Sequence, residues 1–136
     1  MDRKLDLAKR VVGISAVIFG LCGIVFPLSS ISAAELNSQG LGAKLLRTAV
    51  VIAIAAHLYL LGAGSKLCFG RDSRFLRHFF GLETIYVLSW AFVLVPLGST
   101  GSINKYEISK ILVVNAGFTC QIFLLFPLWG WLVLRR

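Results

Sequence analysis

The sequence predicts an all-α integral membrane protein, a four-helix bundle in which neighbouring helices run antiparallel. Hydrophobic residues make up 57% of its 136 residues and charged residues only 15%, whereas about a quarter of an average soluble domain is charged. The apolar residues are gathered in four runs, each long enough to cross a hydrocarbon core about 30 Å thick. Most of the basic residues lie between these runs or near the chain ends. We therefore expect a single four-span membrane domain over residues 1–136.

The first two spans are expected at about 11–28 and 46–64. The first run exceeds the roughly 7–15 apolar residues of a signal peptide, so we expect it to be retained as a membrane anchor. Residues 29–45 are mostly small and polar, which predicts a loop that contains a short interfacial helix. The second span is near the lower length limit for crossing a bilayer, and Gly62 and Gly64 are expected to end it.

The last two spans are expected at about 79–97 and 111–134. Segment 98–110 between them is polar and contains glycine, which predicts a connection outside the hydrocarbon core. Trp129 and Trp131 lie in the final turns of the last run, where an aromatic belt at the membrane surface is typical. Short connections make successive helices antiparallel neighbours, which favours the bundle.

The distribution of Lys and Arg predicts which side of the membrane each segment faces. Ten of the fourteen lie in the N-terminal tail, in segment 65–78 or at the C-terminus. Because cytoplasmic segments carry an excess of Lys and Arg, we expect both termini and loop 65–78 on the cytoplasmic (or matrix or stromal) side. The net charge of +8 is then explained by anionic lipid headgroups, and we expect no nucleic-acid partner.

Segment 65–78 is the most basic part of the chain between two apolar runs. Its expected contacts are lipid headgroups or an acidic loop of a partner subunit. The candidate residues are Lys66, Arg71, Arg74, Arg77 and His78. The alternative is that these charges only determine the topology and bind no partner.

Small residues recur at helical spacing on the first two spans. Helices in lipid attract each other mainly through close backbone approach, which small residues permit. The first span offers Gly13, Ala16, Gly20 and Gly23, and the second offers Ala49, Ala53 and Ala56. We predict that these two seams pack against each other. On the fourth span, Asn115 and Gln121 are expected to hydrogen-bond to a neighbouring helix.

Three polar residues within the spans are candidates for a ligand or proton site. In helical geometry His57 and Tyr86 lie at a similar depth, about 10 Å from the basic side of the membrane, and Glu83 lies one turn from Tyr86. They would form a cluster between the second and third spans, suited to a proton relay or to binding a headgroup or quinone. The alternatives are that Glu83 pairs with Arg77 or His78 or faces a neighbouring subunit, and that His57 bonds to a backbone carbonyl or to Tyr86.

The remaining patterns indicate no metal centre or redox cofactor. The two histidines lie at different depths, so we expect no haem bound between them, and no three ligands cluster for zinc. Cys22, Cys68 and Cys120 form no CxxC motif, and a disulfide framework is not expected. We predict no cofactor, although bound lipid is expected.

The chain has no recognisable nucleophile–base motif and its loops are short, so an enzyme is the less expected class. We expect a non-enzymatic accessory or scaffold subunit of a larger membrane protein complex, with membrane lipids and other membrane subunits as partners. The alternative is a small ligand-binding or proton-coupled transport bundle that uses Glu83, His57 and Tyr86.

Overall fold

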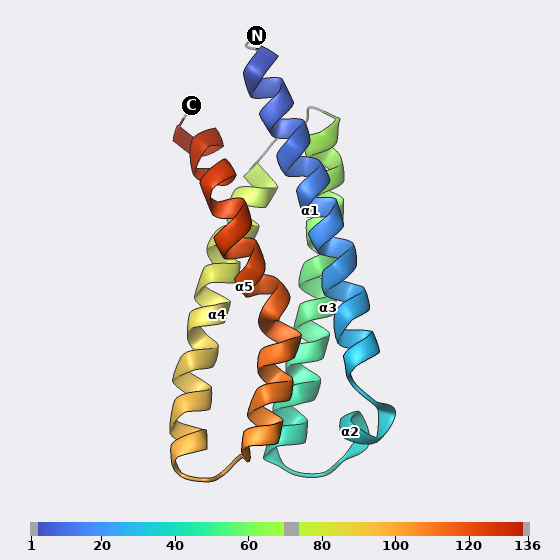
Figure 1. Cartoon of the computed structure of the whole chain (residues 1–136), viewed down its shortest axis with the longest axis vertical. Coiled ribbons are helices and arrows are strands. Elements are labelled where there is room, and N and C mark those ends of the chain that lie inside the picture. The colour runs from blue at the N-terminus through green and yellow to red at the C-terminus, as the bar shows by residue number, and fades with distance from the viewer. Residues whose placement is uncertain (1–2, 70–73, 135–136) are drawn as a thin grey trace.

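The computed structural model describes residues 3–69 and 74–134, without the side chains of Leu5, residues 74–77, Phe80, Ile122 and residues 124–134. Its helices are α1 (Arg3–Ser30), α2 (Ala33–Asn37), α3 (Leu41–Cys68), α4 (Arg74–Ser99) and α5 (Lys105–Leu134). The four long helices lie side by side, and the short α2 lies in the connection between α1 and α3 (Figure 1). The described residues contain no β-strand. The all-helical class predicted from the sequence is therefore confirmed.

Three stretches of the described helices are long and apolar enough to cross a membrane. They are Asp6–Ser30, Leu41–Cys68 and Gly81–Ser99. Large apolar side chains also point outward, and Phe92 on α4 is 81% exposed. Lipid is the solvent that suits such a surface, because acyl chains are as apolar as these side chains. The expectation of membrane-spanning helices is thus supported by three of the four expected spans.

The helices form a closely packed group of three with α4 added at one side. Helix α1 packs mainly against α3 and also against α5, while α4 packs against α5 and α3. Across the described residues, α1 and α4 make no contact. Successive long helices run in opposite directions, so that the two chain ends lie at one end of the molecule and α2 lies at the other (Figure 1).

Side-chain caps explain where α2 and α5 begin. The Ser32 hydroxyl accepts the backbone N–H of Glu35 at 3.2 Å, and the Glu35 carboxylate accepts the backbone N–H of Ser32 at 2.8 Å. Asn104 and Glu107 form the same reciprocal pair at the start of α5, with distances of 2.9 and 2.8 Å. Such capping boxes satisfy N–H groups that have no partner inside the helix. Helix α3 instead follows Gly40, whose φ of +115° is a conformation that glycine adopts without strain.

The four small residues of the first seam lie against α3. A Cβ atom at Gly13 would be 2.9 Å from the carbonyl oxygen of Gly64, and one at Gly64 would be 2.8 Å from Cβ of Ala16. Gly20 approaches the backbone carbonyl of His57, and Gly23 lies directly against the His57 ring. At Gly13, Gly23 and Gly64 a Cβ atom would come within 3.0 Å of the backbone or of the His57 ring, so a side chain there would force the two helices apart.

The three alanines expected to face this seam lie in two different settings on α3. Ala49 and Ala53 are fully buried, but the α1 glycines contact Gly64 and residues near His57. Ala56 lies on another face of α3, beside α4 and α5. Packing of the two small-residue seams against each other therefore stays a prediction, and the α3 positions found against the α1 glycines are Gly64 and His57.

Helix α3 continues through Gly62 and Gly64 to Cys68, beyond the end expected from the sequence. Gly64 has a packing role, because it lies where α1 comes closest, and it does not end the helix. Helix α4 already begins at Arg74. Segment 65–78 is therefore helical at both of its ends, and its residues 70–73 lie outside the described part of the chain.

Candidate functional site

A cavity of about 450 Å³ lies between α3, α4 and α5. Its lining is apolar except for the polar ends of three side chains, Tyr59 on α3 and Glu83 and Tyr86 on α4. Phe79 closes part of the cavity by stacking on Tyr59, with ring centroids 5.8 Å apart. A concave, mostly apolar space with a few polar groups is the usual form of a small-molecule site.

Glu83 and Tyr86 supply two of the three polar groups of this cavity. They are three residues apart on α4, so they lie on the same face of the helix. Glu83 is only 4% exposed. Neither Glu83 Oε1 nor the Tyr86 hydroxyl has a hydrogen-bond partner within the described residues. A buried polar group without a partner costs roughly 1–3 kcal/mol, so a ligand that supplies one gains binding free energy.

The structure separates His57 from the other two candidates of the polar cluster. His57 does not line the cavity that contains Glu83 and Tyr86. The ring of Phe118 contacts both aromatic neighbours, with centroids 4.7 Å from His57 and 5.1 Å from Tyr86. Glu83 and Tyr86 are brought together, whereas His57 faces α1 and α5.

His57 has its own hydrogen-bond partners. Its Nδ1 atom lies 2.6 Å from the carbonyl oxygen of Ala53, and its Nε2 atom lies 2.8 Å from Nε2 of Gln121. A backbone carbonyl only accepts hydrogen bonds, so Nδ1 carries the proton and Nε2 accepts from the Gln121 amide. The bond to a backbone carbonyl is the structural alternative that the sequence left open for this residue.

Asn115 and Gln121, the two α5 residues expected to bond across helices, behave differently from each other. Gln121 is completely buried and bonds to His57 on α3, as expected for a polar residue between membrane helices. Asn115 uses its amide nitrogen for Ile111 O on its own helix, at 3.0 Å. Its Oδ1 atom is buried and has no hydrogen-bond partner in the part of the chain that is described.

Of the basic candidates, only Lys66 and His78 have described side chains, and neither lines this cavity. Lys66 at the end of α3 and His78 near the start of α4 are both exposed. Arg71 lies outside the described residues, and so do the side chains of Arg74 and Arg77. No hydrogen bond or ion pair joins His78 to Glu83, both of which are described.

A second polar cluster, which the sequence did not reveal, joins α2 to the start of α5. The Tyr106 hydroxyl donates to Oε1 of Glu35 at 2.5 Å, and Nζ of Lys110 lies 3.2 Å from the same oxygen. Lys110 also donates to the carbonyl oxygen of Ser30 at 3.1 Å. The hydrogen bond from Tyr106, followed by those from Ser32, lowers the pKa of Glu35 to about 2. We call Glu35, Tyr106 and Lys110 the Glu35 cluster.

Of the three residues of the Glu35 cluster, only Glu35 had a signal in the sequence. The spacing of Ser32 and Glu35 is that of a capping box, so a helix start could be recognised there. Tyr106 is 71 residues away, and no local pattern indicates that it meets Glu35. Arg47 strengthens the same end of the molecule by donating to the carbonyl oxygens of Leu36, at 2.6 Å, and Ser38, at 3.0 Å.

Over the described residues, no group of three or more His, Cys, Asp and Glu side chains is placed to hold a metal ion. Three polar features stand out among the described residues: the cavity beside Glu83 and Tyr86, the buried pair of His57 and Gln121, and the Glu35 cluster. Comparison of the chain with protein-family models, with curated proteins and with solved structures finds no match.

Proposed function

We propose that the chain is a four-helix membrane bundle in which α1, α3, α4 and α5 each cross the bilayer once. Both termini and segment 65–78 would face the cytoplasm (or matrix or stroma). The positive-inside rule supports this orientation, because ten of the fourteen Lys and Arg residues fall on that side. The common location of the two chain ends and the opposite location of α2 agree with it (Figure 1).

We further propose that this bundle is a non-enzymatic binding protein for a small hydrophobic molecule, held in the cavity between α3, α4 and α5. The observation that carries the proposal is the buried carboxyl group of Glu83, which faces an apolar cavity of about 450 Å³ without a partner among the described side chains. Ionisable groups inside membrane proteins are costly, and they commonly mark a ligand or proton site.

The chemistry of the cavity defines the ligand class. Aromatic and aliphatic walls favour an apolar body, and Glu83 and Tyr86 favour one polar head group that forms hydrogen bonds. Glu83 is also the group that would carry a proton if binding belonged to a proton-coupled transport cycle. His57 is not part of this proposal, because its two ring nitrogens already have partners.

The proposal is tested by filling the cavity. Ala56 lines it, and its neighbour Ala55 is exposed on the outer surface, so Ala56→Phe has a matched control in Ala55→Phe. The wild type and both variants are purified in a mild detergent, and the small molecules that remain bound are extracted and measured by mass spectrometry. We expect a molecule that is retained by the wild type and by Ala55→Phe, and lost from Ala56→Phe. Equal small-molecule content in the two variants would contradict the proposal.

A second candidate is an accessory or scaffold subunit of a larger membrane complex, with lipids and other membrane subunits as partners. The outer face of α4 favours it, because this helix contacts only α3 and α5 among the described elements and exposes Ile85, Phe92 and Val95. Native mass spectrometry of the extracted protein tests the idea. A single chain without co-migrating subunits would rule it out, whatever the outcome for the cavity beside Glu83.

A further inference from the structure

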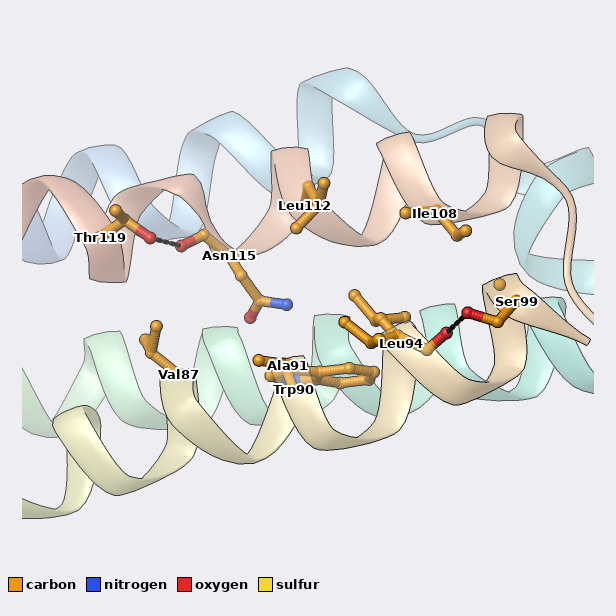
Figure 2. A pocket seen from close by; sticks show the side chains of 11 residues that line it. Val87, Trp90, Ala91, Leu94, Ser99, Ile108, Leu112, Asn115 and Thr119 are labelled. Atoms are coloured by element: carbon orange, nitrogen blue, oxygen red, sulfur yellow. Dashed lines mark hydrogen bonds between the residues drawn. The ribbon is translucent and has the colours of Figure 1, made fainter.

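A second cavity, of about 690 Å³, lies between α4 and α5. It extends from the level of Val87 and Thr119 to the level of Ser99 and Ile108, near the connection of the two helices (Figure 2). No residue lines both this cavity and the one beside Glu83. It is thus a separate space, and an inference about it does not depend on the proposed function.

Two buried polar atoms belong to this cavity. Asn115 is 6% exposed and Trp90 is 8% exposed. Neither Asn115 Oδ1 nor Trp90 Nε1 has a hydrogen bond of good geometry among the described residues, and the polar side chain beside the indole is Tyr86, whose ring lies edge-on to it with centroids 6.1 Å apart. In Figure 2 the Asn115 side chain points from α5 across the cavity towards α4, where Trp90 forms part of the opposite wall.

The two atoms have complementary needs. Asn115 Oδ1 only accepts hydrogen bonds, and the indole N–H of Trp90 only donates one. The Nδ2 group of Asn115 is already bonded to Ile111 O, which holds the amide in this orientation. A hydroxyl group both donates and accepts, so one hydroxyl that reached both atoms would satisfy both.

The rest of the lining determines what carries the hydroxyl. Most of the wall is aliphatic, including Val87, Leu94 and Leu112, and it accommodates an apolar body. A charged head group would lie beside this aliphatic wall without an oppositely charged partner, because none of the lining residues is ionisable. The volume is within the range of about 300–1,000 Å³ that small-molecule sites occupy.

We propose that the cavity between α4 and α5 binds a neutral lipid-soluble alcohol, whose hydroxyl donates to Asn115 Oδ1 and accepts from Trp90 Nε1. The apolar body lies along the aliphatic wall. Free alcohols and the glycerol esters of fatty acids share this chemistry, and the probes below distinguish them.

Trp90 itself reports binding. The chain has three tryptophans, so the substitutions Trp129→Phe and Trp131→Phe leave Trp90 as the single fluorophore. The probes are 12-bromo-1-dodecanol, its methyl ether and the glycerol monoester of 12-bromododecanoic acid, because bromine quenches tryptophan fluorescence at short range. We expect saturable quenching by the free alcohol, with half-saturation at about one tenth of the concentration that the ether requires, which is the effect of one hydrogen bond. Saturation by the monoester at the same concentration as the free alcohol would identify acylglycerols as ligands, and weaker binding would identify free alcohols.

Substitutions test whether the preference for the alcohol over the ether depends on Asn115. Asn115→Leu should weaken binding of the alcohol to the level of the ether, and Cys120→Leu, at an exposed position on the same helix, should change neither. Ala56→Phe fills the other cavity and should leave the quenching intact. Equal quenching by alcohol and ether, an unchanged preference in Asn115→Leu, or loss of quenching in Ala56→Phe would each overturn the proposal.

One further variant keeps the test decisive if Asn115→Leu does not fold. Ala91 lines the cavity between α4 and α5 and is itself exposed, so Ala91→Phe narrows the cavity without changing a buried polar group. Saturable quenching should disappear in Ala91→Phe. If it persists there, the alcohol binds elsewhere and the proposal is wrong.

Discussion

The side-chain amide of Gln121 on α5 lies 2.8 Å from Nε2 of His57 on α3, and both residues are completely buried. The other ring nitrogen of His57 is bonded to the carbonyl oxygen of Ala53, and Gly23 of α1 lies against the ring. A neutral histidine is thereby held from three helices at once. This arrangement makes His57 the centre of the packing between α1, α3 and α5.

The pair of His57 and Gln121 is expected to stabilise the fold as a unit. His57→Leu and Gln121→Leu should each lower the free energy of unfolding by about 1–3 kcal/mol, because each leaves a buried polar partner unsatisfied. The double variant should lose less than the sum of the two, with a coupling of about 0.5–2 kcal/mol. Unfolding in mixed detergent micelles measures these values, and strictly additive losses would contradict the pairing.

Gly23 is expected to tolerate no side chain. A Cβ atom there would overlap the His57 ring, which cannot move aside because both of its nitrogens are bonded. Gly23→Ala should therefore destabilise the protein by about 1–3 kcal/mol through overpacking. Gly62→Ala is the matched control, since nothing lies within 4 Å of a Cβ atom at that position. Thermal unfolding in detergent compares the two, and similar melting temperatures would refute the prediction.

The Glu35 cluster predicts a loss of stability in acid. The pKa of Glu35 is lowered from 4.5 to about 2, mainly by the hydrogen bond from Tyr106. A lowered carboxyl pKa means that the stabilising interaction is fully present above the ordinary value and is lost as the pH falls towards the lowered one. The difference in melting temperature between the wild type and Glu35→Gln should thus shrink between about pH 4.5 and pH 2.

Tyr106→Phe provides the control for this pH dependence. Removing the phenol hydroxyl removes the largest cause of the lowered pKa, so the remaining contribution of Glu35 should be smaller and should be lost at a higher pH. Melting curves at a series of pH values measure it. A Tyr106→Phe variant with the same acid profile as the wild type would show that the hydrogen bond has no such effect.

The proposed orientation predicts that segments 65–78 and 98–110 face opposite sides of the membrane. After the three natural cysteines are replaced by alanine, Ser73→Cys and Ser102→Cys each supply one thiol for labelling. A membrane-impermeant thiol reagent added to intact cells should label Ser102→Cys alone, and it should label Ser73→Cys only after the membrane is opened. Labelling of both thiols from the same side would show that the four-span topology is wrong.

Much of the helical framework could be predicted because it depends on the length and hydrophobicity of consecutive segments of the chain. Apolar runs of sufficient length must form helices in lipid, where every backbone group needs an internal partner. The first three predicted apolar runs are found in the long helices α1, α3 and α4. The end of α3 was predicted less well, because Gly64 looks like a helix terminator in the sequence. In the structure it allows α1 to approach closely.

The candidate site could be predicted only in part. Glu83 and Tyr86 share a face because they lie three residues apart on one helix, whereas the cavity that both of them line depends on the packing of α3 and α5. The place of His57 could not be derived from depth alone, since residues at one depth can point in any direction around a helix. The rotation of α3 turns His57 towards Gln121, and Phe118 fills the space between His57 and Tyr86.

The amino-acid sequence by itself determined that this protein is helical, that it is apolar enough for lipid, and that small residues line one face of its first helix. Only the tertiary structure decided which side chains meet. Gln121 reaches His57 across 64 residues and Tyr106 reaches Glu35 across 71. The physical reason is that composition and periodicity describe one helix at a time, whereas partners and cavities depend on how the helices rotate and slide until their side chains fit together.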